Sequence, residues 1–236
     1  MTLSSTDVAR PTDKGAAGGV SFLFAPRDAL SADDGGIYRN GLKRLLDITL
    51  VVLAAPVTVP LIAFLALIVA LGGGKPFYSQ SRIGRGGKVY TMWKLRSMVR
   101  QADVALEAHL QANPLARAEW DRTQKLKVDP RITRFGKILR KSSFDELPQL
   151  WNVFNGDMSL VGPRPMMPCQ RSLYPGQAYY RLRPGITGIW QVSKRNESSF
   201  ADRAGFDADY ARKLSLRTDL ALLGATVRVV LRGTGY

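Results

Sequence analysis

The longest apolar run of the chain lies at residues 48–74, where no charged residue occurs in 27 positions. A helix that spans a bilayer needs about 20 apolar residues, so this length predicts a membrane-embedded segment. A buried hairpin of a soluble protein is the alternative that the pattern leaves open. Ala55, Pro56 and Pro60 lie near the middle of the run, and each proline removes a backbone donor and favours a kink.

Basic residues flank this run on both sides, with Arg39, Lys43 and Arg44 before it and Lys75, Arg82, Arg85 and Lys88 after it. Because positive residues favour the cytoplasmic side of a membrane, a re-entrant hairpin broken at Pro56 satisfies both flanks. Each arm would reach only about 18–21 Å at 1.5 Å per residue, short of the roughly 30 Å hydrocarbon core. A single kinked span is the alternative, and it places one basic flank on the opposite side.

The rest of the chain predicts an α+β fold that is mostly helical and has small β elements. Alternating apolar positions favour a β-hairpin of residues 76–80 and 89–96, and residues 189–192 are a further candidate for a short strand. Helical spacing of apolar residues marks the stretches 99–120, 134–141, 200–211 and 214–231. A shorter helix is expected to open at Asp145 and to end at Asn155-Gly156.

Composition divides the chain into three expected parts. Residues 1–38 are rich in small and polar residues and predict a disordered N-terminal tail. Residues 39–74 form the membrane-embedded part. Residues 75–236 carry the amphipathic pattern of a single domain, which the basic flanks place on the cytoplasmic side.

The charge balance indicates an anionic partner. The chain has 34 basic and 19 acidic residues, a formal charge of +15, and sixteen basic residues against five acidic ones lie between residues 75 and 141. Nucleic acid, an anionic membrane face and a phosphorylated substrate all fit such a surplus. A single cysteine, Cys169, excludes an internal disulfide, and together with a single histidine, His109, it argues against a zinc site.

The stretch from Arg140 to Pro165 combines two adjacent carboxylates with a constrained arginine. Asp145 and Glu146 open the expected short helix, and Arg164 lies between two prolines that restrict its backbone. A capping box is the structural alternative for the carboxylates, because a serine precedes each of them by three positions. A rigidly held guanidinium suits bidentate capture of a phosphate, although a surface turn is equally compatible with this sequence.

These features together predict an enzyme at a membrane face that acts on phosphate esters. Positive surroundings favour ionised carboxylates, which serve as a nucleophile or as Mg²⁺ ligands. Phosphoryl transfer requires neutralisation of the phosphate oxygens, for which the chain offers constrained basic residues, namely Lys94, Arg140, Arg164 and Arg183.

Ordered motifs extend from about Gly41 to the C-terminus. They are Lys43–Asp47, Trp93–Met98, Asp129–Thr133, Arg140 with Ser143 and Asp145–Gln149, Gly156–Pro165, Arg183–Gly188 and Gln191-Val192. This set resembles the bacterial sugar transferase family, the monotopic polyprenol-phosphate phosphoglycosyl transferases, and in particular the branch that initiates exopolysaccharide synthesis. The resemblance covers roughly 195 residues, and so many ordered motifs make it specific.

The resemblance implies a two-step reaction that uses a UDP-sugar, polyprenol (undecaprenyl) phosphate and Mg²⁺. Asp145 matches the nucleophile, which would form an aspartyl-phosphosugar intermediate and expel UMP, and Glu146 matches the second acid, which helps to hold Mg²⁺. Positions tied to substrate phosphates or to the integrity of the site are Lys94, Arg140, Pro163, Arg164 and Arg183, and Asp207 matches a further acid. The branch commonly transfers galactose or glucose phosphate.

One detail departs from the family pattern. The family's membrane helix is re-entrant and broken at Ser-Pro, whereas the dipeptide here is Ala55-Pro56, so the hydroxyl that helps the break is missing. The resemblance implies a bacterial cytoplasmic membrane protein whose partners are its substrates, the bilayer, and possible further copies or other glycan-assembly enzymes, with no nucleic acid. A membrane-tethered nucleic-acid binder and a non-catalytic scaffold are the rival hypotheses, although no helix-turn-helix or RNP-like motif occurs.

Overall fold

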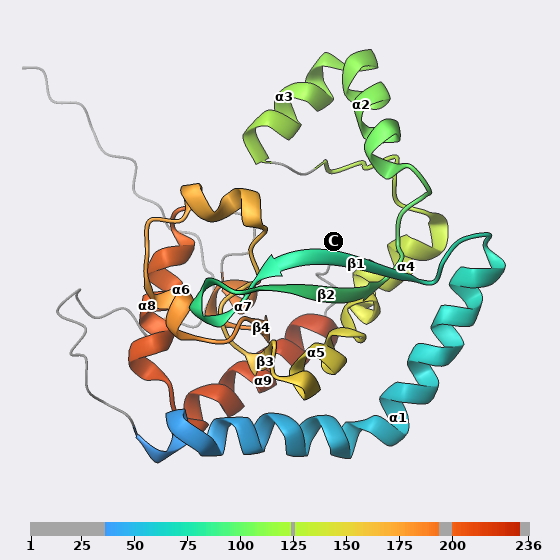
Figure 1. Ribbon diagram of the computed structural model, residues 1–236. Helices are drawn as coiled ribbons and strands as arrows, with labels where there is room; N and C mark the ends of the chain where they lie inside the picture. Colours follow the sequence, from blue (N-terminus) through green and yellow to red (C-terminus); the bar gives the residue numbers. More distant parts are fainter. Residues whose placement is uncertain (1–35, 124–125, 194–199, 232–236) are drawn as a thin grey trace, which may run out of the picture. The chain divides into compact units, whose positions relative to one another are not determined.

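The computed structural model describes residues 36–123, 126–193 and 200–231, all of which belong to the second of two units, Gly35–Tyr236. The predicted tail at residues 1–38 therefore lies almost wholly outside the described residues. Within them, the expected α+β fold, mostly helical with small sheets, is confirmed (Figure 1). The expected division at residues 38, 74 and 75 stays a prediction.

The elements follow each other in chain order. The helices are α1 (Lys43–Leu71), α2 (Ala102–Ala112), α3 (Pro114–Thr123), α4 (Arg134–Ser142), α5 (Gln149–Asn155), α6 (Ala178–Arg181), α7 (Ile189–Val192), α8 (Arg203–Lys213) and α9 (Leu216–Leu231). The strands are β1 (Phe77–Ile83), β2 (Val89–Leu95), β3 (Ser159–Val161) and β4 (Gly185–Thr187). A π-helical turn precedes α1 (Tyr38–Leu42), and 3₁₀ turns occur at Arg85–Gly87, Phe144–Glu146 and Pro168–Leu173.

Helix α1 contains the long apolar run. Together with the preceding π-helical turn it spans 34 residues, and its most apolar 18-residue window has a mean hydropathy of 2.6 and is only 17% buried. By length and composition it is the one helix among the described residues that could cross a membrane. The low burial argues against a buried soluble hairpin, and α1 leaves many large apolar side chains exposed, including Leu53, Val57, Phe64, Leu67 and Leu71.

The prolines of α1 bend the helix without ending it. The helix runs unbroken through Pro56 and Pro60, so the expected interruption at Pro56 is not seen as a gap. Figure 1 shows α1 as two arms that meet at a bend. A proline removes one hydrogen bond of the ladder and clashes with the preceding turn, which bends a helix more readily than it ends one when neighbouring turns are strongly helical.

Both arms of α1 pack on the rest of the fold. Val51 of the first arm belongs to a cluster with Met92 and Val153, and Leu65 of the second arm packs with Leu95. The start of the helix is also held by polar contacts. Asp219 of α9 is 1% exposed and accepts hydrogen bonds of 2.6 Å each from Tyr38 Oη and Lys43 Nζ. These contacts fasten the base of α1 to the C-terminal helix.

The predicted β-hairpin is confirmed, and β1 and β2 pair antiparallel. Arg82 lies opposite Tyr90, Gln80 opposite Met92, and Tyr78 opposite Lys94. Directly paired residues of an antiparallel sheet point to the same side, and every second residue shares a face. Arg82 and Lys94 therefore lie on one face of the hairpin.

A second, parallel pairing joins two sequence motifs that are far apart in the chain. In β3 and β4, Ser159 pairs with Gly185 and Val161 with Thr187. Close backbone contact requires glycine here, because a Cβ on Gly162 would lie 2.3 Å from the carbonyl oxygen of Arg183. The Gly-Pro-Arg-Pro loop that follows β3 is thus packed directly against the Arg-Pro-Gly segment before β4.

Two expected elements differ from the structure. Residues 189–192 form α7 and the strand lies at Gly185–Thr187, so the strand expected at 189–192 is wrong; a four-residue apolar run fits either structure until its neighbours decide. The helix expected at 99–120 is divided into α2 and α3 at Asn113, which has extended backbone angles. Pro114 follows it, and a proline disfavours the α conformation of the preceding residue.

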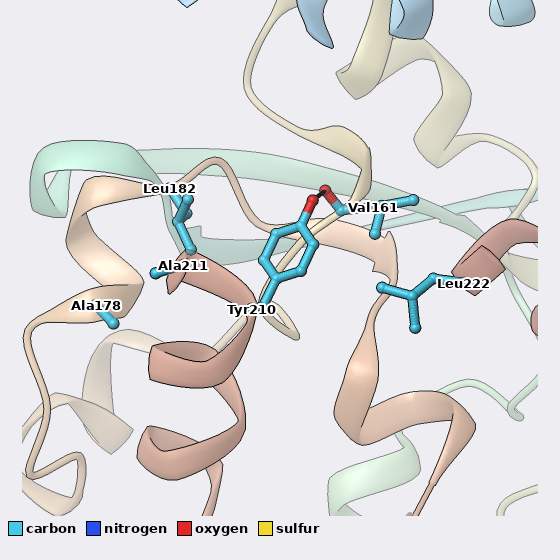
Figure 2. Packing of buried hydrophobic residues seen from close by; sticks show 6 residues of the cluster. All are labelled: Val161, Ala178, Leu182, Tyr210, Ala211 and Leu222. Atoms are coloured by element: carbon cyan, nitrogen blue, oxygen red, sulfur yellow. Dashed lines mark hydrogen bonds between the residues drawn. The ribbon is translucent and has the colours of Figure 1, made fainter. Parts of the chain in front are cut away.

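The core beside β3 is built around Tyr210 of α8, as Figure 2 shows. Its ring packs among Val161, Leu182 and Leu222, and its hydroxyl donates to the carbonyl oxygen of Val161 at 3.1 Å. The single hydrogen of this hydroxyl is shared with the carboxylate of Asp219, which lies 2.7 Å away. Tyr210 therefore links the end of β3 to the residue that holds the base of α1.

Candidate active site

The two adjacent carboxylates lie in a tight turn between helices. Asp145 and Glu146 belong to the 3₁₀ turn Phe144–Glu146, whereas α5 begins only at Gln149, so the helix expected to open at Asp145 starts later. Pro148 is the residue before that helix, and a proline is well tolerated at a helix start because it has no N–H group to leave unpaired.

The capping alternative for the carboxylates is wrong. The hydroxyl of Ser142 donates to the carbonyl oxygen of Ile138 at 2.9 Å, within its own helix. Ser143 precedes the 3₁₀ turn with φ of 59°, and its side chain makes no capping hydrogen bond. A left-handed serine reverses the chain direction after α4, and this reversal places the carboxylates beside the hairpin.

Lys94 meets the second carboxylate. Its Nζ atom lies 2.8 Å from Glu146 Oε1, and both side chains are about one-quarter exposed. Lys94 comes from β2, the strand whose inner face also carries Met92. The strand therefore supplies a cation directly beside the Asp-Glu turn, and the expected role of Lys94 in phosphate binding stays a prediction.

Burial controls the ionisation of Asp145, which is 8% exposed. Desolvation raises the pKa of Asp145 to about 6, and Glu146 also raises it, while Lys94 and Arg140 act in the opposite direction. The positive surroundings therefore favour the ionised carboxylate as the sequence indicated, but burial has the larger effect on the pKa of Asp145. At neutral pH the carboxylate still exists mainly in its ionised form.

Arg140 is held close to this turn from α4. Its Nε atom donates to Ser97 Oγ at 2.9 Å, and burial lowers its pKa despite the opposing fields of Asp145 and Asp129. Asp129 itself is paired with Arg131 at 2.7 Å, and hydrogen bonds from Arg131 lower the pKa of Asp129 against the effect of its burial. Ser97 therefore positions the guanidinium of Arg140, and the positive charge of this guanidinium lowers the pKa of Asp145.

A small pocket opens beside Glu146. Its lining includes Lys94, Glu146 and Arg164, together with Gln149 at the start of α5. The guanidinium of Arg164 lies 5.4 Å from the centroid of the Trp190 ring. A stacked guanidinium keeps its N–H groups in its own plane, where they can bind an anion.

The loop residue before Arg164 has a structural contact. The carbonyl oxygen of Pro163 accepts a hydrogen bond of 2.8 Å from the backbone N–H of Gly185. This bond locks the Arg164 loop to β4. The sequence expectation placed Pro163 among the phosphate-binding positions, and the structure gives it a part in holding the arginine.

Five expected site residues are not among the described residues that line this pocket, namely Asp145, Arg140 and Pro163, treated above, and Arg183 and Asp207. Arg183 donates from Nε to the carbonyl oxygen of Gly156 at 2.9 Å, and burial, with Arg44 and Arg85 nearby, lowers its pKa. Asp207 of α8 accepts a hydrogen bond of 2.8 Å from the hydroxyl of Tyr174, and burial raises its pKa to about 7. Both residues thus support neighbouring segments in the part of the chain that the structure describes.

Sequence reasoning missed one basic residue of the pocket. Arg82 of β1 lines it together with Lys94 and Arg164. The signal was available in the hairpin, since correct pairing of the strands places Arg82 on the same face as Lys94. The register of a hairpin is hard to fix from sequence when its turn is rich in glycine.

The donor set suits Mg²⁺ better than a cation that needs many protein ligands. No group of three or more His, Cys, Asp or Glu side chains that could hold a metal ion occurs within the described ranges. Asp145 and Glu146 provide two carboxylates next to a cation-lined pocket. Mg²⁺ is commonly held by one or two carboxylates and by substrate phosphates, so the residues present fit this ion.

The chain matches known proteins over almost all of its described length. A family model described as bacterial sugar transferase matches residues 38–233. A UDP-galactose-lipid carrier transferase of Erwinia amylovora is 45% identical over 196 residues, which are 82% of this chain and 41% of that protein. An undecaprenyl-phosphate galactose phosphotransferase of Salmonella typhimurium is 44% identical over 221 residues, which are 92% of this chain and 46% of that protein.

A relative of similar length also matches. The exopolysaccharide production protein ExoY of Sinorhizobium fredii is 41% identical over 196 residues, which cover 82% of this chain and 87% of that protein. By contrast, the chain spans less than half the length of the Erwinia and Salmonella relatives. The length of the family match, together with the Asp-Glu turn, the basic pocket and the apolar helix, shows that this chain belongs to the bacterial sugar transferase family.

Proposed function

We propose that the protein transfers a sugar phosphate from a UDP-sugar to polyprenol phosphate, releases UMP and thereby initiates a surface glycan. The observation that carries the proposal is the buried Asp145 in the same turn as Glu146, whose pair with Lys94 lines a pocket together with Arg164. The names of the relatives support the reaction class, since one is a UDP-galactose-lipid carrier transferase and another is an undecaprenyl-phosphate galactose phosphotransferase. Galactose and glucose are the expected sugars, and a glucose-1-phosphate transferase is also among the relatives.

In the first step, an ionised oxygen of Asp145 attacks the phosphorus atom that carries the sugar. The bond from this phosphorus to the bridging oxygen breaks, and its electron pair leaves with UMP. The product is an acyl phosphate between Asp145 and the sugar phosphate. Lys94 and Arg140 offset the negative charge that gathers on the phosphate oxygens during this step.

In the second step, a phosphate oxygen of polyprenol phosphate attacks the same phosphorus atom. The bond to Asp145 breaks, the carboxylate is regenerated, and the sugar ends on a polyprenyl diphosphate. Each step exchanges one phosphorus–oxygen bond for another, so no oxidant or reductant is needed. Burial of Asp145 keeps water away from an acyl phosphate that hydrolysis would otherwise consume.

Asp145 and Glu146 would hold the Mg²⁺ ion that the family implies, with Lys94 orienting Glu146. When bound, the ion would supply further neutralisation of the phosphate oxygens. The residues of the chain otherwise act by position: Arg140 is fixed by Ser97, and the loop of Arg164 is fixed by β4.

We also propose that α1 enters and leaves the bilayer on the cytoplasmic face. The bend between its arms and the basic residues on both flanks support this topology. Thr58 supplies a local cause for the bend, since its hydroxyl donates to the carbonyl oxygen of Ala54 at 3.0 Å. Hydroxyl bonds of this kind bend helices, and Thr58 could replace the serine that is absent before Pro56.

The test uses the purified chain in detergent with Mg²⁺, a short-chain polyprenol phosphate and a panel of UDP-sugars. We expect UMP release with one donor, and we expect Asp145→Ala to abolish both turnover and the covalent phosphosugar adduct seen by intact mass. Asp103→Asn, which changes an exposed aspartate of α2, is the matched control and should turn over normally.

Two results would change this assignment. Normal turnover by Asp145→Ala would remove Asp145 as the nucleophile. A folded wild-type protein that releases no UMP with any donor would favour the non-catalytic scaffold, the alternative function for a membrane-anchored member of this fold.

A further inference from the structure

Arg82 lies on the same face of the β1–β2 hairpin as Lys94, and both residues line the pocket beside Glu146. The hairpin is rigid, because the two strands are paired along their full lengths. Arg164 reaches the same pocket from the loop after β3. Three cations from two separate parts of the chain therefore converge on one small space.

The side chain of Arg82 is oriented but incompletely bonded. One terminal nitrogen donates to the carbonyl oxygen of Pro165 at 3.1 Å, and the other donates to Gln80 Oε1 at 2.6 Å. Its Nε atom is buried and has no hydrogen-bond partner among the residues that the structure describes. A buried donor without a partner costs free energy, and a bound acceptor would remove that cost.

Arg82 and Arg164 also repel each other. Burial lowers the pKa of Arg82, and the field of Arg164 lowers it further. Burial lowers the pKa of Arg203 to about 10, and the positive charges of Arg164 and Arg82 contribute to this shift. A protein that brings guanidinium groups together at a partly buried site is best stabilised by an anion that contacts them.

The charge of the pocket selects the kind of anion. Its lining holds three basic side chains, Arg82, Lys94 and Arg164, against one acidic side chain, Glu146, which leaves an excess of two positive charges. The diphosphate of a nucleotide-sugar carries two negative charges. A guanidinium presents paired N–H groups that match the oxygens of a phosphate.

We propose that Arg82 and Arg164 together bind the diphosphate of the nucleotide-sugar at the phosphate that departs with UMP. The inference rests on the proposed function, in which Asp145 attacks the phosphate that carries the sugar. Lys94 and Glu146 line the pocket next to the turn that carries Asp145, and Arg82 and Arg164 supply further positive charge in the same pocket for the leaving phosphate. Negative charge grows on that phosphate as the bridging bond breaks, so donors fixed there favour the transition state.

The experiment measures binding separately from turnover. Wild-type protein, Arg82→Gln and Arg82→Lys, all full-length in detergent, are titrated with UMP and, in a second arm, with farnesyl phosphate as a soluble polyprenyl phosphate. Loss of a charged hydrogen bond weakens binding roughly ten- to a hundredfold, and we expect this loss of UMP affinity in Arg82→Gln. Arg82→Lys should fall between the two proteins, since it keeps the charge and loses the paired donors.

Several controls make the result decisive. Arg181→Gln removes an exposed arginine of α6 and should bind UMP as the wild type does. A thermal melt of each apo protein identifies variants that fail to fold, and for such a case the UMP-induced rise in Tm of Arg82→Lys replaces the titration. UMP affinity equal to that of the wild type in Arg82→Gln would overturn the inference.

The remaining outcomes separate the two proposals. Weakened farnesyl phosphate binding with unchanged UMP binding would assign Arg82 to the lipid substrate and overturn the inference. If the wild-type protein turns over and Arg82→Gln binds UMP normally, the proposed function is supported and the inference about Arg82 is overturned. A wild-type protein that binds UMP through Arg82 but turns over no donor would support the binding site and remove the proposed reaction.

Discussion

The Nζ atom of Lys94 lies 2.8 Å from Glu146 Oε1, although the two residues are 52 positions apart in the chain. This pair joins the β-hairpin to the turn that carries Asp145. One lysine thereby acts on two carboxylates: it forms an ion pair with Glu146, and its field lowers the pKa of Asp145 against the effect of burial.

The pH dependence of turnover should report this arrangement. Burial raises the pKa of Asp145 to about 6, and only its ionised form can attack phosphorus. We therefore expect kcat/KM to rise as the pH increases through about 6. Lys94→Met removes the field that lowers this pKa, so the rising limb should move to higher pH, whereas Lys94→Arg should keep it near the wild-type position. A limb that does not move in Lys94→Met would contradict the coupling of Lys94 to Asp145.

Stability should change with pH through Asp207. Burial raises its pKa to about 7 from the ordinary aspartate value of about 4, so between these values the folded state binds more protons than the unfolded state. The contribution of Asp207 to stability is therefore present below about pH 4 and is lost as the pH rises towards 7. Asp207→Asn should remove this dependence and raise the free energy of unfolding at pH 8 by at most about 1.4 kcal/mol for each unit of the shift, which a higher Tm at that pH would show. Melts of both proteins from pH 4 to 8 test this, and parallel curves would show that Asp207 titrates normally.

Gly162 lies so close to the backbone of the segment before β4 that we expect this position to tolerate no side chain. Gly162→Ala would place a Cβ 2.3 Å from the carbonyl oxygen of Arg183, and both segments would have to move. We expect a loss of about 1–3 kcal/mol in unfolding free energy, typical of overpacking, together with loss of turnover. Gly224→Ala is the matched control, because nothing lies within 4 Å of a Cβ there, and alanine should stabilise this helical position slightly. Equal melting of Gly162→Ala and the wild type would mean that the loops are not in contact.

The bend of α1 should depend on Thr58. Its hydroxyl bonds the carbonyl oxygen of Ala54, and Thr58→Val removes this bond at nearly constant volume. In a Cys169→Ser background, a cysteine at Ser5 should be shielded from an impermeant reagent in intact cells. We expect Thr58→Val to increase the labelled fraction, while Thr58→Ser remains shielded. Full labelling of the cysteine at position 5 in the protein that keeps Thr58 would establish a single span in place of re-entry.

Much of the scaffold could be predicted from sequence because its signals are local. The apolar run predicted α1, and the alternation around a glycine turn predicted β1 and β2. Asn155-Gly156 correctly predicted the end of α5, where Gly156 has φ of 89°. Each of these depends on residues that lie close together in the chain.

The details of the site depend on contacts that sequence does not display. Ser143 adopts a left-handed conformation that few non-glycine residues occupy, and this turn decides where Asp145 points. The sign of the pKa shift of Asp145 follows from how deeply the fold buries it, which the surrounding charges did not reveal. The place of Arg82 in the pocket follows from the register of the hairpin, which the sequence alone did not fix.

The bonds that Tyr38 and Lys43 make with Asp219 also bear on the order of events during synthesis. Lys43 and Asp219 are 176 positions apart, so α1 leaves the ribosome long before its partner helix α9 has been made. Chains emerge N-terminus first, and an apolar helix without its docking surface is prone to aggregate. The nascent α1 therefore needs an apolar environment before α9 can dock, and Asp219 completes the attachment only after 176 further positions have been synthesised.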